Sequence, residues 1–247
     1  MSDPTHPVLF ITGAARRIGA ALTTFLHQRG YDIIMHCHRS TDDAQQLVAT
    51  LNQHRQQSVQ CVQADLTTMD GLTHIQQSLA NQPRLDGVIH NAAVFYPTPM
   101  ATASMAQWDA LFDCNVKAPF FLNQMLAPQL CDSQGCIVNI ADIHAEKPLK
   151  NYSIYCMTKA ALLMQTQSLA RELAPTVRVN AVAPGPTLWP DGLENTLNQQ
   201  QQQDLIERTV LKRLGRPEHI AQAVWHCLTN DYLTGQVINV DGGRSLK

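Results

Sequence analysis

The chain lacks the features that mark membrane, secreted and nucleic-acid-binding proteins. Its 247 residues carry a formal net charge of −2, so the chain lacks the excess of positive charge that would attract nucleic acid or an anionic membrane. No apolar run approaches the roughly 20 residues of a membrane span, and residues 1–7 have neither the basic nor the apolar region of a signal peptide. We therefore expect a cytoplasmic protein that binds neither nucleic acid nor membranes.

Paired cysteine motifs are also missing. The seven cysteines are odd in number and include no C-x-x-C spacing, so neither a disulfide framework nor a zinc site is indicated. His36, Cys37 and His38 come closest to a ligand cluster, but residues two apart on a strand share a face and no third ligand is evident. We expect reduced, mostly buried cysteines and no metal.

What the chain does have is a regular alternation of short apolar runs with helix-like segments. Its length suits one domain with one core. Alternation of this kind predicts an α/β fold, a doubly wound parallel sheet of Rossmann type, in a single domain of residues 1–247. The expected strands span residues 8–11, 32–37, 58–63, 87–90, 136–140, 178–183 and 236–240, and the expected helices span 18–29, 42–54, 69–80, 104–130, 152–174 and 217–228.

A glycine-bearing turn follows the first apolar run. Val8 to Ile11 has strand character, and residues 12–19, T-G-A-A-R-R-I-G, lead into an amphipathic segment that continues to Arg29. A strand, a turn and a helix in this order place backbone N–H groups and the positive end of a helix dipole against a phosphate. We expect a cofactor phosphate site here; the plainer alternative is an ordinary strand-to-helix turn.

Tyr155 and Lys159 stand four residues apart in a segment expected to be helical, and Asp142 precedes the tyrosine by thirteen residues. Positions i and i+4 share a helix face, so the ammonium can favour the phenolate and lower the tyrosine pKa from its usual value of about 10. A phenol tuned in this way can donate a proton near neutral pH. The pattern indicates an active site, although a solvated helix face can carry the same spacing.

These residues resemble the short-chain dehydrogenase/reductase family, and the likeness extends over nearly the whole chain through Asn91-Ala92-Ala93, Asn115 and Pro184-Gly185. Two positions depart from the family's common pattern. Arg17 stands where the middle glycine of the turn is usual, and Asp142 stands where a serine is usual. Both departures are shared by the pteridine reductases, which residues 38–40, 91–99 and 152–159 also resemble. We take that subgroup as the interpretation.

The end of the second expected strand bears on the choice of cofactor. NAD-specific folds place a carboxylate about 20 residues beyond the turn to bind the ribose 2′-hydroxyl, whereas an arginine there accommodates a 2′-phosphate. Here no carboxylate follows the strand before Asp42, and Arg39 and Ser40 can donate hydrogen bonds to a phosphate. NADPH is therefore the expected cofactor. The residues expected to contact it are Gly13, Arg16, Arg17, Ile18, His38, Arg39, Ser40, Asp65, Leu66, Asn91, Ala92, Ala93, Lys159, Pro184 and Gly185.

Asp142 suits the reduction of a C=N bond. A carbonyl reductase stabilises a developing alkoxide with neutral or cationic donors, which a carboxylate opposes. A ring nitrogen must instead gain a proton, and an Asp142–Tyr155 pair can relay one. The structural alternative is an aspartate that caps the segment after a strand. The resemblance implies that Lys159 also holds the nicotinamide ribose and that Asn115 stabilises a water feeding protons to Lys159, so the expected catalytic residues are Asp142, Tyr155, Lys159 and Asn115.

The resemblance implies a pterin or folate substrate. Phe95 can stack on a flat ring, and Arg17 can touch both a cofactor phosphate and the pterin edge, so the expected substrate contacts are Arg17, Phe95, Asp142 and Tyr155. The expected activity is NADPH-dependent reduction of a 7,8-dihydropterin, such as dihydrobiopterin or dihydromonapterin, with dihydrofolate as a candidate further substrate. Two alternatives stay open: a generic 3-oxoacyl-type carbonyl reductase, and a non-catalytic NADP-binding sensor.

Residues 189–213 interrupt the rhythm of strands and helices, with few apolar residues and a run of five glutamines. They fit a solvated helix or loop, and the resemblance implies a substrate flap at this place in the chain. It also implies a homotetramer in which the C-terminal tail packs near a neighbouring subunit, with Arg244 reaching the neighbour's substrate site.

Overall fold

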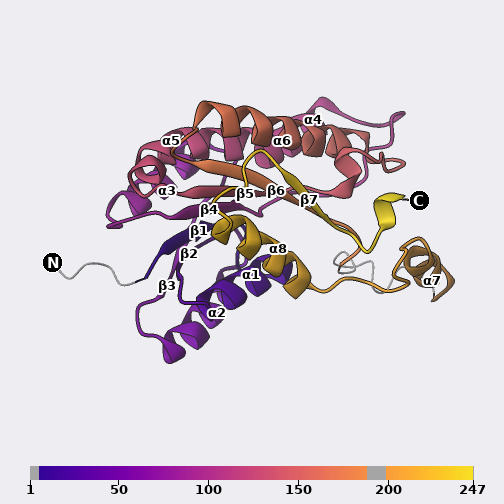
Figure 1. Cartoon of the computed structure of the whole chain (residues 1–247). Helices are drawn as coiled ribbons and strands as arrows, with labels where there is room; N and C mark the ends of the chain where they lie inside the picture. The colour runs from indigo at the N-terminus through magenta and orange to yellow at the C-terminus, as the bar shows by residue number, and fades with distance from the viewer. Residues whose placement is uncertain (1–5, 188–198, 247) are drawn as a thin grey trace.

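Seven parallel strands form one sheet in the order β3-β2-β1-β4-β5-β6-β7. In the computed structural model, which describes residues 6–187 and 199–246, every neighbouring pair of these strands is parallel (Figure 1). The chain reverses its direction of travel across the sheet between β1 and β4, so the predicted single-domain, doubly wound α/β fold of Rossmann type is confirmed. The strands are β1 (Val8–Ile11), β2 (Asp32–Cys37), β3 (Val59–Gln63), β4 (Gly87–His90), β5 (Cys136–Ile140), β6 (Arg178–Pro184) and β7 (Val237–Val240).

Helices cover both faces of this sheet, as Figure 1 shows. The first layer consists of α1 (Arg17–His27), α2 (Thr41–His54) and α8 (Pro217–Thr229). The opposite layer consists of α3 (Met69–Ala80), α5 (Ala118–Asp132) and α6 (Ser153–Glu172). The described helices match the expected ones closely, apart from the segment 104–130.

Two apolar cores arise from alternate side chains of the same strands. Along β1, Leu9 and Ile11 face α1 and α8, whereas Val8 and Phe10 face α3, α5 and α6. All four side chains are buried, and full burial of such a side chain stabilises the fold by about 1.5–3 kcal/mol. A parallel strand covered on both faces reads as a continuous apolar run, which is why these runs predicted the strands. The packed sheet fixes the positions of the loops at its carboxyl ends.

The predicted helix over 104–130 is divided into three parts. It consists of α4 (Met105–Phe112), a π-helical segment η1 (Asp113–Lys117) and α5. Hydrogen bonds in a π-helical segment span five residues along the chain, one more than in an α-helix, and such segments occur often at functional sites. Asn115, one of the expected catalytic residues, lies at the centre of η1. The predicted helical segment is therefore present, and the π-helical part at the point where the chain approaches the site was not predicted.

The turn that follows β7, residues 241–243, is called the C-terminal turn here, and it binds the backbone of the segment that precedes α8. The backbone N–H groups of Val210 and Leu211 both donate to Gly242 O, at 2.9 and 3.0 Å. Within the predicted flap of residues 189–213, residues 189–198 lie outside the described residues, and the glutamine run forms helix α7 (Gln199–Glu207), one of the two alternatives that the sequence left open. Among the helices of the described residues, none is both long enough and apolar enough to cross a membrane.

Candidate active site

The loops that follow β1, β4 and β5 carry several of the residues singled out in the sequence. Gly13 follows β1, Asn91 follows β4, and Asp142 follows β5 by two residues. In an open parallel sheet, ligands bind beyond the carboxyl ends of the strands where the strand order reverses. The reversal here lies between β1 and β4. The sheet therefore brings these loops together at one edge.

The turn after β1 has no room for side chains at its two glycines. Gly13 has φ +61°, and a Cβ there would lie 2.9 Å from Ala92 Cα. A Cβ on Gly19 would lie 2.1 Å from Gly13 O and 2.8 Å from Asn91 Nδ2. Glycine thus permits both the left-handed turn and the close approach of α1 to it. These are the roles that glycines have in a dinucleotide-binding turn, so the turn fits a nicotinamide cofactor's pyrophosphate.

Thr12 and Asn91 fasten this turn to the loop after β4. Thr12 Oγ1 accepts hydrogen bonds from the backbone N–H groups of Asn91 and Ala92, both at 3.0 Å. The Asn91 side chain returns two bonds from Nδ2, to Thr12 O at 3.0 Å and to Gly13 O at 2.8 Å. Thr12 was missed among the predicted site residues. A hydroxyl directly before the glycine at a strand end was the signal available for it.

Arg17 adopts a backbone conformation that favours glycine. Its φ is +53°, in the left-handed region, which costs a non-glycine residue about 1–2 kcal/mol. In the family that the sequence resembles, this position is usually glycine. The left-handed backbone explains why glycine is common there. The neighbouring Arg16 turns toward α2, with Nε 3.8 Å from Asp43 Oδ2. Ile18, the third residue predicted here, is half-buried against the core.

The ends of β2 and β3 form a charged corner. His38 Nε2 lies 3.8 Å from Asp65 Oδ2, and Gln63 Nε2 donates to His38 O at 2.9 Å. Hydrogen bonds from Thr67 hold the pKa of Asp65 below its usual value. The remaining predicted residues of this corner are the exposed Arg39, the α2 N-cap Ser40 and the buried Leu66.

Asp142 and Tyr155 form a hydrogen-bonded pair. Tyr155 Oη donates to Asp142 Oδ2 at 2.7 Å, and the tyrosine is only 4% exposed. The other carboxyl oxygen, Oδ1, accepts the backbone N–H of His144 at 2.8 Å. Asp142 thereby caps the short 3₁₀ helix η2 (Ile143–Ala145), so the capping role considered for it is also present. Both oxygens are fixed, one by the backbone and one by the phenol.

The pKa of Tyr155 is raised well above 10, mainly because the phenol is buried and further because of the negative charge of Asp142. This direction is opposite to the lowering expected from Lys159. Lys159 Nζ lies 5.7 Å from the ring centroid and donates to Ile140 O at 2.9 Å, and its own pKa is lowered by burial. The sequence spacing put the ammonium near the ring but did not reveal the burial. The phenol is therefore neutral in this arrangement.

Asn115 connects three elements of the site. Its Nδ2 donates to Val94 O at 3.0 Å and to Thr158 Oγ1 at 3.1 Å, while its Oδ1 accepts from Val94 N at 2.9 Å. These bonds join η1, the loop after β4 and α6, which carries Tyr155. The amide is buried. Asn115 thus supports the backbone that leads to Phe95.

An aromatic wall stands beside the Asp142–Tyr155 pair. Phe95 stacks on Tyr152 with ring centroids 4.6 Å apart and an angle of 16° between the planes. It meets Tyr155 edge to face, with centroids 4.7 Å apart. Phe95 nevertheless remains 39% exposed. The wall therefore offers an apolar surface next to a neutral proton donor.

Three predicted positions have weaker links to this cluster. Gly185 N–H donates to Val240 O at 3.0 Å, and a Cβ on Gly185 would lie 2.6 Å from Asp241 Cα. Pro184 and Gly185 therefore pack against the C-terminal turn, while Ala93 is exposed in the loop after β4. Among the described residues, no group of three histidine, cysteine or acidic side chains is arranged to hold a metal ion.

Comparison with known proteins agrees with this geometry. A family model described as enoyl-(acyl carrier protein) reductase matches residues 13–245. The chain belongs to the short-chain dehydrogenase/reductase family and is an oxidoreductase. Membership in this family implies a nicotinamide cofactor, which the turn between β1 and α1 fits.

Relatives of similar identity have different names. Pteridine reductase 1 of Leishmania tarentolae is 33% identical, over 99% of this chain and 98% of its own. Dihydromonapterin reductase of Klebsiella pneumoniae is 30% identical over the full length of both chains. A 3-oxoacyl-(acyl-carrier-protein) reductase of Rickettsia felis is 29% identical over 98% of both chains. The identities are too similar to distinguish the substrates.

Proposed function

We propose that this protein is a pteridine reductase, which uses NADPH to reduce a 7,8-dihydropterin such as dihydrobiopterin or dihydromonapterin to its tetrahydro form. The observation that carries the proposal is the 2.7 Å hydrogen bond between Tyr155 Oη and Asp142 Oδ2. Relatives named pteridine reductase 1 and dihydromonapterin reductase add support. Dihydrofolate, which has the same dihydropterin ring, is a candidate further substrate.

The chemistry of the pair favours a C=N bond over a C=O bond. A carbonyl oxygen becomes an alkoxide when carbon takes a hydride, and a carboxylate beside it would oppose that charge. A ring nitrogen must gain a proton as its carbon gains a hydride. The bound nicotinamide supplies the hydride. Tyr155 holds a proton on Oη because burial and Asp142 raise its pKa, and the carboxyl group beside it can return a proton from solvent after each turnover.

Lys159 and Asn115 support this transfer in the proposal. Lys159 is buried with Nζ fixed on Ile140 O, where its remaining N–H groups can hold the nicotinamide ribose. Asn115 fixes the loop after β4 and the start of α6 through Val94 and Thr158. It thereby sets the distance between the aromatic wall and Tyr155, and a water near it can pass protons to Lys159.

The aromatic wall supplies the proposed pterin contact. One face of Phe95 is covered by Tyr152, and the residue as a whole remains 39% exposed. A flat heteroaromatic ring stacked on the remaining surface gains on the order of 1–3 kcal/mol. Arg17 is an arginine at a position whose left-handed backbone favours glycine. We propose that its side chain reaches both a cofactor phosphate and the pterin edge.

The choice of NADPH over NADH rests on the corner at the end of β2. His38, Arg39 and Ser40 follow the strand, and no carboxylate lies between Cys37 and Asp42. Arg39 is exposed, so its guanidinium is accessible to a 2′-phosphate, to which it can form a charge-assisted bond. We assign Ser40, Asp65 and Leu66 to the adenosine end of the same cofactor.

The proposed assembly is a cytoplasmic homotetramer. Strand β7 lies at an edge of the sheet and its side chains are only half-buried or exposed, although parallel sheets are normally covered. Phe120 on α5 and Met157 and Met164 on α6 are exposed apolar side chains of the kind that gather at protein interfaces. In this assembly Arg244 reaches a neighbour's substrate site and residues 189–213 act as the substrate flap.

An NADPH-oxidation assay across dihydrobiopterin, dihydromonapterin, dihydrofolate and an acetoacetyl thioester tests the proposal. We expect turnover with at least one dihydropterin at a kcat/KM well above that with the thioester. Turnover of the thioester alone would instead establish a carbonyl reductase. This alternative is included because the Rickettsia relative is named a 3-oxoacyl-(acyl-carrier-protein) reductase. Binding of NADPH without turnover of any substrate would establish a non-catalytic sensor.

A further inference from the structure

His36 is a buried histidine that neither the catalytic pair nor the aromatic wall contacts. It lies near the end of β2, with only 2% of its surface exposed. Its Nδ1 accepts the backbone N–H of Gly13 at 3.2 Å, and its Nε2 lies 3.1 Å from Ala64 O. The ring therefore spans from the turn after β1 to the residue that follows β3.

The two partners specify one neutral tautomer of the ring. A backbone N–H can only donate and a carbonyl oxygen can only accept, so Nδ1 carries the lone pair and Nε2 carries the proton. Burial lowers the pKa of His36 to about 4. Among charged neighbours, His38 disfavours the imidazolium and Asp65 favours it, as does the Ala64 carbonyl. Burial outweighs these two contributions, so the His36 ring is neutral in the folded protein.

Backbone hydrogen bonds on either side make the ring part of a continuous connection. Ala14 N–H donates to His36 O at 2.9 Å, and Ala64 N–H donates to Cys37 O at 3.1 Å. The ring adds a side-chain link between the β1 turn and the end of β3. In the proposed complex the cofactor contacts both Gly13 and residues 64–66. The imidazole of His36 and the adjacent backbone bonds to β2 connect these two segments.

We propose that His36 is a positioning residue for the nicotinamide cofactor, which holds the Gly13 turn and the Ala64–Leu66 segment at the separation that the pyrophosphate and adenosine ends require. This inference rests on the cofactor assignment made above, not on the identity of the substrate. The bond from Gly13 N–H to the ring acts together with the bond from Asn91 Nδ2 to Gly13 O, and the two restrain a glycine that has φ +61° and no Cβ to limit its backbone. Loss of that restraint should weaken cofactor binding and leave the chemistry of Tyr155 intact.

Three substitutions separate the two bonds. His36→Phe keeps the ring volume and removes both bonds, leaving Gly13 N–H and Ala64 O without partners. His36→Asn keeps an acceptor where Nδ1 stands, because the amide Oδ1 occupies a similar position, and loses the bond to Ala64. His36→Gln places its amide nearer to Ala64 and loses the acceptor for Gly13. If His36→Phe fails to fold, the comparison of His36→Asn with His36→Gln still tests the proposal.

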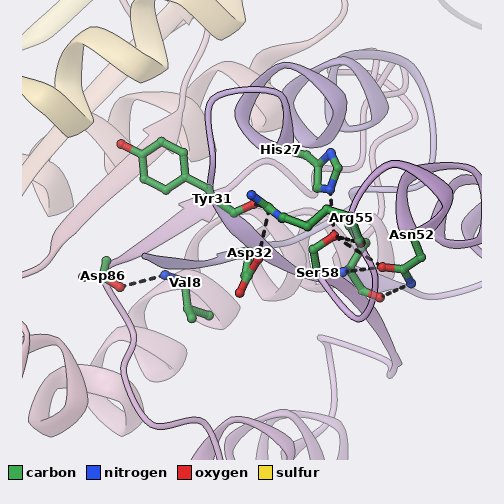
Figure 2. Close-up of polar contacts among 9 residues, drawn as sticks. Val8, His27, Tyr31, Asp32, Asn52, Arg55, Ser58 and Asp86 are labelled. Carbon is green, nitrogen blue, oxygen red and sulfur yellow. Dashed lines mark hydrogen bonds and ion pairs between the residues drawn. The ribbon is translucent and has the colours of Figure 1, made fainter. Parts of the chain in front are cut away.

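His27 offers a matched control, since it is a second buried histidine whose pKa is lowered by burial. Its Nε2 lies 2.7 Å from Ser58 Oγ at the opposite end of the sheet (Figure 2). His27→Phe should lower the free energy of unfolding, measured with urea, and leave the dissociation constant for NADP⁺ within about twofold of wild type, because its partners are remote from the cofactor turn.

The decisive measurement is NADP⁺ binding by titration calorimetry, followed by KM and kcat with the active dihydropterin. We expect His36→Phe to raise the Kd and the KM for the cofactor about tenfold, from the loss of its hydrogen bonds, with kcat changed less than about threefold. His36→Asn should recover most of the affinity and His36→Gln less of it. Wild-type affinity in His36→Phe, or equal losses in the asparagine and glutamine variants, would overturn the inference. Failure of the wild-type protein to bind any nicotinamide nucleotide would instead refute the cofactor assignment.

Discussion

The two ends of the sheet use buried and half-buried polar side chains in different ways. At the amino ends of the strands, His27 contacts Ser58, and Arg55 Nη2 lies 3.0 Å from Asp32 Oδ1 (Figure 2). Asn52 bonds both the N–H and the C=O of Val59, each at 2.9 Å. These side chains fasten the end of α1 and the end of α2 to β2 and β3. They bond one another and the local backbone.

At the carboxyl ends, the same kinds of groups hold loops and still leave surface for a ligand. Thr12, His36 and Asn91 fix backbone N–H and C=O groups of the turn and its neighbours, while Phe95 is 39% exposed and Arg39 is exposed. The amino-end cluster therefore accounts for stability alone. The carboxyl-end cluster accounts for stability and for the shape of the site, and substitutions at the two ends should separate these properties.

The largest expected effect comes from Tyr155→Phe. The substitution removes the Oη proton and keeps the ring, so kcat should fall by the 10²–10⁴ typical of a lost general acid while substrate binding survives. Steady-state kinetics with a dihydropterin measures both quantities. Ser58→Ala at the amino end is the control: it should lower the free energy of unfolding by about 1–3 kcal/mol and leave kcat unchanged. A loss of kcat in both variants would contradict the separation of the two ends.

How much of this could be read in the sequence differs between the ends. The Asp142–Tyr155 pair was predictable because one residue follows a strand and the other lies early on the next helix, so the topology brings them together. His27 and Ser58 belong to no motif, and their contact depends on how α1 packs beside β3. The sign of the Tyr155 pKa shift also escaped prediction, because burial, its main cause, is a property of the packed fold.

The parallel sheet was predictable for a simpler reason. Its inner strands, such as β1, β4 and β5, are buried on both faces, so each contains an apolar run that stands out locally. The π-helical segment η1 has no such signature, since an extra residue in a helical turn is stabilised by contacts such as those of Asn115 with Val94 and Thr158. Those contacts join parts of the chain that are distant in sequence.

A smaller effect is expected at the cofactor corner. Arg39→Asp should lower the ratio of kcat/KM with NADPH to that with NADH by about ten- to a hundredfold, because a charged hydrogen bond contributes roughly 1.5–3 kcal/mol. Competition between the two cofactors in an oxidation assay gives the ratio. Arg29 provides a surface control, since it contacts Phe25 and Trp225 on the α1–α8 side. An unchanged ratio in Arg39→Asp would remove Arg39 from the cofactor site.

Acid should destabilise both ends. His90, the buried last residue of β4, has its Nε2 2.7 Å from Asn123 Oδ1. Burial lowers the pKa of His36 and His90 to about 4 and also lowers that of His27. The unfolded chain takes up these protons near pH 6.5 and the folded chain resists them, so stability is complete above pH 6.5 and is lost as pH falls toward 4. At pH 5 the loss is about 2 kcal/mol for each of His36 and His90. Urea unfolding at pH 7.5 and pH 5 measures it, and equal stabilities would contradict the burial of neutral histidines.

The smallest expected effect is at Arg17. Arg17→Gly relieves a left-handed φ of +53° and should raise the free energy of unfolding by about 1 kcal/mol, while weakening cofactor and pterin binding. Arg16→Gly is the matched control, because Arg16 has an extended φ of −137° and glycine there relieves nothing. Thermal unfolding compares the two variants. A stability gain in Arg16→Gly as large as in Arg17→Gly would show that the strain is not the cause.

The central claim, that Asp142 and Tyr155 together protonate a pterin nitrogen, is tested most directly at Asp142. The variants to compare are Asp142→Ser, which restores the residue usual in the family, and Asp142→Asn, which keeps an acceptor for the His144 N–H at the cap but cannot relay a proton. We predict that both variants lose pterin reduction by about a hundredfold or more, and that Asp142→Ser alone gains measurable reduction of an activated ketone. Wild-type rates of pterin reduction in either variant would contradict the account, leave Asp142 with its capping role only, and return the activity of this chain to carbonyl reduction.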